Sequence, residues 1–407
     1  MIAYHFPPLA GSSGIQRTLR FVQHLPALGW TPIVLTAEPR AYARTSPDLM
    51  KDVPDGTVVR RAFALDTARH LNILGRYAGW MARPDRWISW RFDAVRQGLQ
   101  LVKEYKPDVI WSTYPIATAH VIAQQLHQKT GLPWVADFRD PMAQDGYPVD
   151  PVTWRSYQRI EQQAVEHASR SVFTTPGAAQ LYRDRYPQAA SRITVLENGF
   201  DEESFANAPS AAVRVLTDDQ PVVLLHSGIV YPSERDPTQL FQALQRLKAS
   251  GGLSARQLTI RFRASAHDDM LGQLASQYGV QDFIELSPAV PYREALAEML
   301  SVDALLVLQA SNCNAQIPAK IYEYLRAGRP ILGLTDPAGD TAGVLRGAGV
   351  EAMARIDSAD EIAVVLPRFV AAVRTQTVRL PDPLAVKNAS RQGRSQAFAE
   401  MLNGVLR

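Results

Sequence analysis

A lysine and a glutamate stand at the start of a predicted helix in IPAKIYEYLRAGRPILGL, residues 317–334. Pro318 suits a first helical turn, where its missing N–H removes no hydrogen bond. Lys320 lies in that turn, so its charge and the positive end of the helix could attract an anion. Glu323 shares a helix face with Lys320, and its carboxylate could accept hydrogen bonds from both vicinal hydroxyls of a ribose. The alternative is a solvent-exposed ion pair between the two side chains, and the segment alone favours that alternative.

A second candidate anion site follows the predicted strand of LHSGIVYPSERDP, residues 225–237. The strand runs into a turn of small residues that contains Gly228, and a single cation, Arg235, lies further along the turn. Backbone amides together with one cation can hold a diphosphate.

The first strand-to-helix turn, FPPLAGSSGIQR at residues 6–17, is a third candidate. Two glycines flank two serines there: Gly11, Ser12, Ser13 and Gly14. Glycine lets backbone N–H groups approach an anion at a helix start, which indicates contact with a phosphate or with an acceptor substrate. A turn followed by a helix N-cap explains the same residues. The spacing G-x-x-G is not the G-x-G-x-x-G of dinucleotide sites, so a dehydrogenase is disfavoured.

Two acids and one histidine are candidates for catalysis. Asp137 and Asp140 flank Arg139 just beyond a predicted strand, in WVADFRDPM. Either acid could act as a general base for a sugar hydroxyl, or the three side chains could form a salt-bridge cluster that fixes the loop. His120 opens the predicted helix of TAHVIAQQL. It could bond a sugar or a phosphate, or it could be a cap or a packed histidine.

The stretch GRYAGWMARPDRWISWR, residues 75–91, interleaves arginines with aromatic side chains. Its possible contact residues are Arg76, Trp80, Arg83, Arg86, Trp87 and Trp90. Such a mixture suits an interface with anionic lipid headgroups, or a stacked sugar. A hydrophobic arm packed on its own domain, with arginines outward, fits the pattern equally well.

Bulk composition indicates an ordinary globular protein of two or three domains. The chain has 407 residues, of which 46% are hydrophobic and 20% charged. A net charge of +3 is too small to indicate nucleic acid binding. The only cysteine, Cys313, allows no internal disulfide and no cysteine-based metal site, and we expect a packed thiol in a reducing cytoplasm. We expect neither a signal peptide nor a membrane-spanning helix.

Short apolar strands alternate with helices along the chain, which predicts parallel sheets buried on both faces. The predicted strands are residues 1–6, 31–37, 108–114, 133–138, 171–175, 193–198, 221–228, 257–265, 283–287, 304–310 and 330–334. The predicted helices are residues 14–29, 93–105, 118–131, 237–250, 268–279, 292–302, 319–328 and 391–406. Small and polar residues at 207–221 indicate a linker between two doubly wound halves.

These segments, in this order, resemble the GT-B glycosyltransferases, specifically the family-4-like group that uses nucleotide-sugar donors. The most specific pieces are ENGFDEESF and PAKIYEYLRAGRPIL, and the resemblance covers about residues 1–400. It implies an α/β fold of two tandem Rossmann-like domains facing across a cleft. The first domain, residues 1–206 joined by the C-terminal helix 385–407, would bind the acceptor. The second, residues 207–384, would bind the donor.

The resemblance also implies roles for the residues of the donor half. Glu323 matches the glutamate that binds the donor ribose, and Arg235 matches the cation that neutralises the diphosphate. Gly228, Pro318 and Lys320 complete the expected donor site. The sequence departs from the family in two places: Ala315 stands where a first glutamate is common, and Ile229 follows Gly228 where an arginine is common.

The sequence therefore predicts a retaining, metal-independent glycosyltransferase that needs no cofactor beyond its nucleotide-sugar substrate. The resemblance implies a saccharide or lipid-linked saccharide as acceptor, in polysaccharide biosynthesis at the cytoplasmic face of a membrane. Asp137, Asp140 and His120 are the predicted catalytic residues. A nucleotide-sugar epimerase of the same fold and a non-catalytic GT-B partner subunit remain alternatives.

Overall fold

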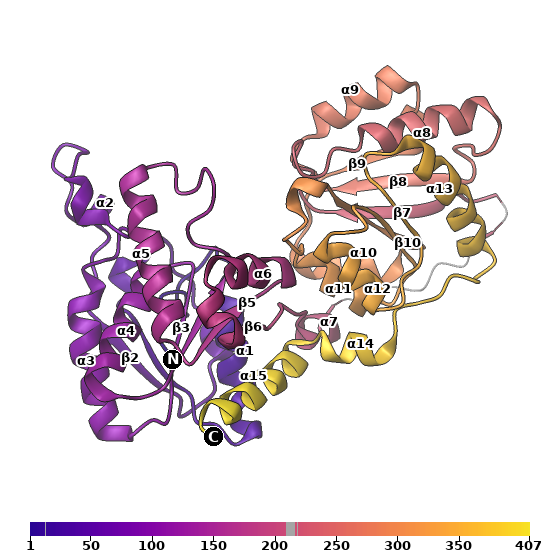
Figure 1. The fold of residues 1–407 in the computed structure, drawn as a ribbon. Helices are drawn as coiled ribbons and strands as arrows, with labels where there is room; N and C mark the ends of the chain where they lie inside the picture. Colours follow the sequence, from indigo (N-terminus) through magenta and orange to yellow (C-terminus); the bar gives the residue numbers. More distant parts are fainter. Residues whose placement is uncertain (13, 209–215, 218) are drawn as a thin grey trace. The chain divides into compact units, whose positions relative to one another are not determined.

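The computed structural model describes residues 1–12, 14–208, 216–217 and 219–407, so Ser13 and part of the predicted linker lie outside the described residues. The chain divides into two compact units (Figure 1). The first consists of Met1–Asn198 and Arg391–Arg407, and the second of Gly199–Ser390. The observed boundaries differ from those expected at residues 206 and 384 because flanking residues such as Phe200 and Phe205 pack in the second unit's core.

The first unit is built on parallel strands. They are β1 (Ile33–Ala37), β2 (Val58–Ala62), β3 (Ile110–Thr113), β4 (Trp134–Arg139), β5 (Arg170–Phe173) and β6 (Ile193–Val195). Ile2 bridges both Leu35 and Ser112, and so joins the β1–β2 pair to the β3–β4–β5–β6 sheet. The strand expected at residues 1–6 is thus reduced to one bridging residue. Strand β2 was not predicted, and its half-buried residues VVRRA explain why: they show neither an apolar run nor clear alternation.

The first unit also contains seven α-helices within the residues that the structure describes. They are α1 (Gly14–His24), α2 (Thr67–His70), α3 (Trp90–Tyr105), α4 (Thr118–Thr130), α5 (Pro151–His167), α6 (Pro176–Arg185) and α15 (Arg391–Val405). The C-terminal helix α15 lies beside α1 (Figure 1), where Phe398 packs on Phe21 with ring centroids 4.4 Å apart. The return of this helix to the first unit agrees with what the resemblance implied.

The second unit repeats the scheme with strands β7 (Val222–Ser227), β8 (Leu258–Arg263), β9 (Ile284–Ser287), β10 (Ala304–Gln309), β11 (Ile331–Thr335) and β12 (Met353–Ala354). They form one parallel sheet in the order β12-β11-β10-β7-β8-β9. Neighbouring residues of β7 enter different cores, Leu224 one and Leu225 the other, so both faces of the sheet are buried. This is the pattern of a doubly wound sheet.

The helices of the second unit are α7 (Glu202–Ala206), α8 (Thr238–Ala249), α9 (Asp268–Tyr278), α10 (Tyr292–Ser301), α11 (Lys320–Ala327), α12 (Asp340–Gly347), α13 (Ala359–Arg374) and α14 (Pro383–Asn388). Helices α8, α9 and α13 contribute to one core, and α10, α11 and α12 contribute to the other. Short 3₁₀ turns occur at Leu25–Leu28, Pro39–Ala41, Met50–Asp52, Gly79–Ala82, Pro187–Arg192, Gln281–Phe283 and Ser311–Cys313. The prediction of two tandem Rossmann-like domains is confirmed. Within the described residues, no helix is long and apolar enough to cross a membrane.

A buried carboxylate in α5 fixes the loop that follows β4. Glu161 is fully buried and accepts hydrogen bonds from the Tyr186 hydroxyl at 2.8 Å and the Ala143 N–H at 3.0 Å. It also accepts a hydrogen bond from Tyr182 and pairs with Arg185 at 2.6 Å. These contacts compensate the buried Glu161 carboxylate for the hydrogen bonds to water that it loses on folding.

We expect Glu161→Ala to lower the free energy of unfolding by about 3 kcal/mol, because it leaves three buried donors and a cation without their acceptor. Urea unfolding of the full chain measures this. Glu166→Ala on the exposed side of the same helix is the control and should change the free energy by less than about 0.5 kcal/mol. Equal effects of the two substitutions would contradict the role of the buried network.

Candidate functional site

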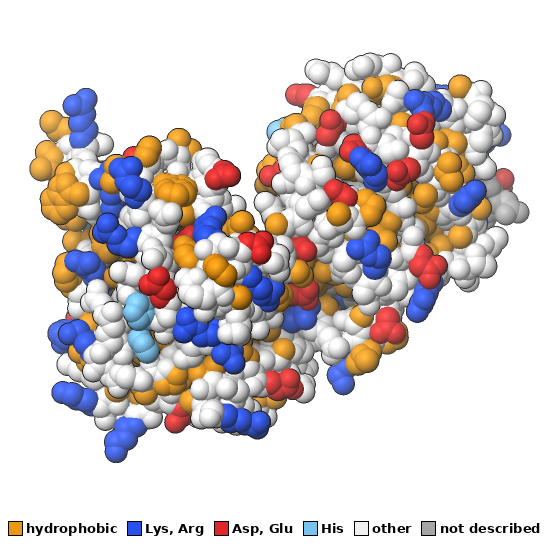
Figure 2. All heavy atoms as spheres, viewed as in Figure 1, with side chains coloured by type: hydrophobic (Ala, Val, Ile, Leu, Met, Phe, Trp, Pro, Cys, Tyr) orange, Lys and Arg blue, Asp and Glu red, His pale blue; other side chains and the backbone are white. Residues whose placement is uncertain are grey.

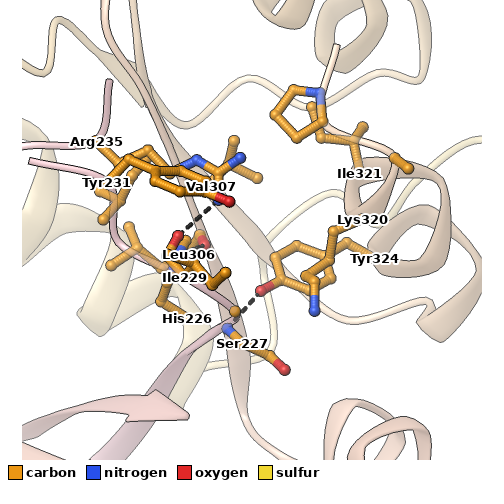
Figure 3. Close-up of a pocket in the computed structure, with 14 residues that line it drawn as sticks. His226, Ser227, Ile229, Tyr231, Arg235, Leu306, Val307, Lys320, Ile321 and Tyr324 are labelled. Atoms are coloured by element: carbon orange, nitrogen blue, oxygen red, sulfur yellow. Dashed lines mark hydrogen bonds between the residues drawn. The ribbon is translucent and has the colours of Figure 1, made fainter. Parts of the chain in front are cut away.

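A cavity of about 350 Å³ opens beside the carboxyl end of β7 in the second unit. Its wall combines the turn after β7, the strand β10 and the first turns of α11 (Figure 3). The lining residues are His226, Ser227, Gly228, Ile229, Tyr231, Arg235, Leu306, Val307, Leu308, Pro318, Ala319, Lys320, Ile321 and Tyr324. Ligands of doubly wound sheets bind at this end of the strands. Four of the five predicted donor-site residues line this cavity.

The turn and the helix are locked together by one hydrogen bond. The buried Tyr324 hydroxyl, one turn after Lys320, accepts the Ser227 N–H at 2.8 Å, as a dashed line in Figure 3 shows. The next residue, Gly228, has φ +132°, a conformation that L side chains rarely adopt. Its N–H donates to the Arg263 carbonyl at 2.8 Å. The chain can therefore turn sharply at the end of β7 and pass close to the start of α11.

Two cations enter the cavity, Arg235 from the turn and Lys320 from the helix (Figure 3). The Lys320 ammonium lies over Gly228, 3.2 Å from where a Cβ would stand. Burial lowers the pKa of Lys320, and the nearby Arg235 adds to this, against the opposing effect of Glu323. Arg235 stacks over the Tyr231 ring at 5.3 Å and donates to the Ile229 carbonyl at 2.7 Å.

Among the described residues, neither Lys320 nor Arg235 forms a salt bridge with a carboxylate. The anticipated surface ion pair between Lys320 and Glu323 is therefore not formed. Two partly dehydrated cations without a salt-bridge partner, next to a helix N-terminus, are stabilised by an anion that carries more than one charge. The arrangement is thus suited to a diphosphate.

Glu323 does not line the cavity. It is half-buried further along α11, and its Oε1 accepts the Tyr292 hydroxyl at 2.8 Å. The other carboxylate oxygen has no hydrogen bond among the described residues. Glu323 can still accept from a ligand hydroxyl, but only from a ligand that extends beyond the cavity.

Sequence reasoning missed His226, Tyr231 and Tyr324. His226 Nδ1 lies 3.0 Å from the Leu306 carbonyl, and burial lowers the pKa of this histidine to about 4, so it is neutral at pH 7. It lies within the apolar run of a strand and gives no periodic signal. Tyr324 could have been found, because a residue four positions after Lys320 shares its helix face.

In the first unit, Asp137 forms an ion pair in the protein interior, and its carboxylate is not exposed to solvent. It is fully buried at the end of β4, and Arg17 donates to both of its oxygens, at 2.8 and 3.0 Å. The Thr113 hydroxyl also donates to it at 2.9 Å. The salt-bridge alternative therefore describes Asp137 better than the predicted role of base, although its partner is Arg17 and not Arg139.

His120 is likewise a packed histidine. It has no exposed surface, its Nδ1 lies 2.8 Å from the Ser112 hydroxyl, and burial lowers its pKa to about 4. The Trp134 indole N–H donates to the same hydroxyl at 2.8 Å. With no exposed surface, His120 cannot touch a substrate in this structure, so the predicted contact is not supported.

Asp140 is the predicted catalytic acid that stays accessible. It is exposed after β4, yet the surrounding protein limits its hydration and raises its pKa, while Arg139 opposes this. Arg139 itself has φ +63°, at a register shift between β4 and β5. Its guanidinium donates to the Tyr114 carbonyl at 3.3 Å.

The glycine loop forms a close turn at the start of α1. Gly11 has φ +77°, and the Gly14 N–H donates to the Ser12 hydroxyl at 3.2 Å. The same hydroxyl lies 3.2 Å from His5 Nδ1, and a Cβ on Gly14 would stand 2.3 Å from that atom. Gly14 is thus required by the approach of His5, a local reason that needs no ligand. Ser13 lies outside the described residues.

The predicted aromatic and arginine surface is only partly a surface. Trp90 is fully buried and Trp87 packs on the core, while Arg86 pairs with the buried Asp66 at 3.2 Å. Arg83 pairs with Asp150 at 3.4 Å. Trp80 and Arg76, by contrast, are exposed.

Across the described ranges, no three histidine, cysteine, aspartate or glutamate side chains gather as metal ligands, and the free thiol of Cys313 is buried. The site chemistry that the residues offer is the binding of an anion by Lys320, Arg235 and backbone N–H groups.

Comparison with known proteins supports the resemblance. Residues 13–199 match the family model of the glycosyl transferase 4-like domain. HepE of Anabaena in complex with UDP shares 14% identity at a TM-score of 0.61, over 99% of this chain and 98% of that chain. A glycosyltransferase from Rickettsia africae shares 13% identity at a TM-score of 0.61, over 100% of this chain and 98% of that chain.

The UDP-forming α,α-trehalose-phosphate synthase of Burkholderia xenovorans, in complex with glucose-6-phosphate, shares 14% identity at a TM-score of 0.59, over 99% of both chains. No curated protein matches the sequence. These likenesses show a common fold, that of GT-B glycosyltransferases, and the family-model match over residues 13–199 agrees with the resemblance to the family-4-like group.

We expect Gly228→Ala to lower the free energy of unfolding by about 2 kcal/mol, because alanine is strained at φ +132° and its methyl group displaces Lys320. Thermal unfolding measures the effect. Gly272→Ala, in α9 with open space around its Cα, should instead stabilise by a few tenths to about 1 kcal/mol. A Gly228→Ala variant as stable as the wild type would contradict the strained turn.

Proposed function

We propose that the protein transfers a sugar from a nucleoside-diphosphate sugar to a saccharide or lipid-linked saccharide acceptor. The observation that carries this proposal is the pair of cations without a carboxylate partner, Lys320 and Arg235, in the cavity beside β7. A diphosphate supplies the missing negative charge. UDP-bound HepE has the same fold, which makes a uridine nucleotide the first donor to test.

The same two cations can stabilise the leaving group of the proposed reaction. When the bond between the sugar and the diphosphate breaks, negative charge grows on the leaving oxygen. Arg235 and Lys320 stabilise this charge, so we propose metal-independent transfer. A retaining transfer of a hexose needs no strong protein base on the acceptor. This suits a first unit in which Arg17 already binds Asp137, so that Asp140 is the one accessible acid of the two predicted ones.

The acceptor site lies, in this proposal, at the carboxyl edge of the first sheet, near Asp140 and the glycine loop. A sugar phosphate is one acceptor class to test, because the trehalose-phosphate synthase of the same fold is described with glucose-6-phosphate. Polysaccharide biosynthesis is the proposed setting, with a lipid-linked saccharide as the other acceptor class.

A non-catalytic nucleotide-binding subunit is the second candidate, and one observation favours it. Ala315 replaces the acid that is common near the transferred sugar, and Ile229 replaces a common arginine. Incubation with UDP-sugars and a panel of saccharide and sugar-phosphate acceptors separates the possibilities. Glycosylated product supports the proposal, altered donor without acceptor indicates an epimerase, and binding without turnover indicates the subunit.

We expect Lys320→Ala and Arg235→Ala each to weaken UDP binding at least about tenfold, because each removes a charge-assisted contact to the diphosphate. Isothermal titration calorimetry measures the dissociation constant. Lys248→Ala is the control, since that lysine pairs with Asp282 on the surface and does not line the cavity. Unchanged affinity in both cavity variants would overturn the donor site.

Glu323→Ala should also weaken nucleotide-sugar binding about tenfold if the carboxylate holds the ribose hydroxyls. Tyr292→Phe removes the hydrogen bond that Glu323 accepts but keeps the carboxylate, so its effect should be several-fold smaller. Calorimetry with UDP and with 2′,3′-dideoxy-UDP completes the test. The ribose role is refuted if Glu323→Ala weakens both nucleotides equally.

A further inference from the structure

An arm at residues 71–83 exposes large apolar side chains in the first unit. Leu74 is 97% exposed, Ile73 79%, Trp80 72% and Tyr77 39%. Soluble surfaces rarely gather such side chains without a partner. In Figure 2 the projecting segment carries hydrophobic and basic side chains together at its end.

The tip of the arm is a tight hairpin and not a loose loop. Ile73 and Arg76 exchange two backbone hydrogen bonds, at 2.8 and 3.0 Å. The two residues between them, Leu74 and Gly75, have φ +54° and φ +76°. Glycine or asparagine is favoured at both positions of such a turn, so leucine at the first has a conformational cost. The turn thereby holds an apolar side chain at its most exposed point.

The base of the arm is fixed to the domain. Asp66 is fully buried and pairs with Arg86, and Asp85 accepts the Thr118 N–H at 2.8 Å. Arg83 pairs with Asp150 at 3.4 Å, which joins the arm to the loop between β4 and α5. This neighbouring loop also exposes apolar side chains, with Val149 86% exposed and Tyr147 53%. Exposed apolar side chains thus occur on two segments of the first unit that the Arg83–Asp150 pair joins.

The charge around these side chains is positive. Residues 67–92 contain five arginines and a single acid, Asp85, whose carboxylate is buried. Within the described part of the chain, Arg76 and Arg91 have no carboxylate partner. Apolar and aromatic tips among unpaired arginines complement a surface that is apolar inside and anionic outside.

We propose that the arm and the β4–α5 loop dock on a lipid bilayer that carries anionic headgroups. Leu74 and Trp80 insert among the acyl chains near the headgroups, and Arg76 contacts the anionic headgroups. The arm follows β2 and the loop follows β4, so docking brings the carboxyl edge of the first sheet to the bilayer. Asp140 lies at that edge, in the same loop region as Tyr147 and Val149.

Vesicle flotation with the full-length protein and no donor tests the proposal. The protein should float with vesicles of phosphatidylcholine and phosphatidylglycerol in equal parts, and much less with phosphatidylcholine alone. The double variant Leu74→Ser, Trp80→Ser should bind at least about tenfold more weakly, and Arg76→Gln about fivefold. Leu384→Ser, an exposed leucine on α14, should bind like the wild type.

All variants should keep the wild-type melting temperature and UDP affinity, because these side chains are exposed and lie outside the donor cavity. The proposal is overturned if the wild type binds neither vesicle type, or if the double variant binds as tightly as the wild type. It is also overturned if the double variant abolishes self-association in sedimentation while vesicle binding is absent, because the surface would then be a subunit interface.

Discussion

The second unit depends on an electrostatic imbalance. Lys320 and Arg235 approach one cavity from different elements, and within the described residues neither forms a salt bridge with a carboxylate. Burying like charges raises the free energy of the empty protein, and the depressed pKa of Lys320 is one expression of that. The fold maintains the arrangement through uncharged contacts: the Tyr324 hydroxyl on the Ser227 N–H, the glycine turn, and the stacking of Arg235 on Tyr231.

In the first unit, by contrast, the charged side chain at the end of strand β4 is paired inside the protein. Arg17 is almost wholly buried, and Asp137 neutralises it with two hydrogen bonds while the Leu196 carbonyl accepts a third at 3.0 Å. Such an ion pair ties α1 to β4 and to the segment after β6. Asp137 and Arg17 thus neutralise one another in the first unit, whereas Lys320 and Arg235 in the second unit have no salt-bridge partner among the described residues.

The periodicity of the strands and the two cations of the cavity beside β7 could be predicted because they are local signals. Lys320 and Arg235 each stand a few residues after a strand or at a helix start, where the sequence alone places them near a carboxyl edge. Asp137 and His120 could not be interpreted in the same way. From their positions in the sequence, both residues could as well be catalytic as structural. Asp137 is buried against Arg17, and His120 is buried with Ser112 and Trp134, and these tertiary contacts cannot be read from the local sequence. The helices α5 and α13 were missed because the first is largely polar and the second contains Pro367.

The C-terminal helix α15 completes the first unit, so the second unit is an insertion in the chain. The chain enters it after Asn198 and leaves it after Ser390, and these two crossings lie together, since the Phe200 N–H donates to the Ala389 carbonyl at 3.1 Å. Because the two ends of the inserted unit are adjacent, another domain can replace it without changing the fold of the first unit. Under the proposed function, such an exchange would change the donor preference and leave the acceptor-binding unit unaltered.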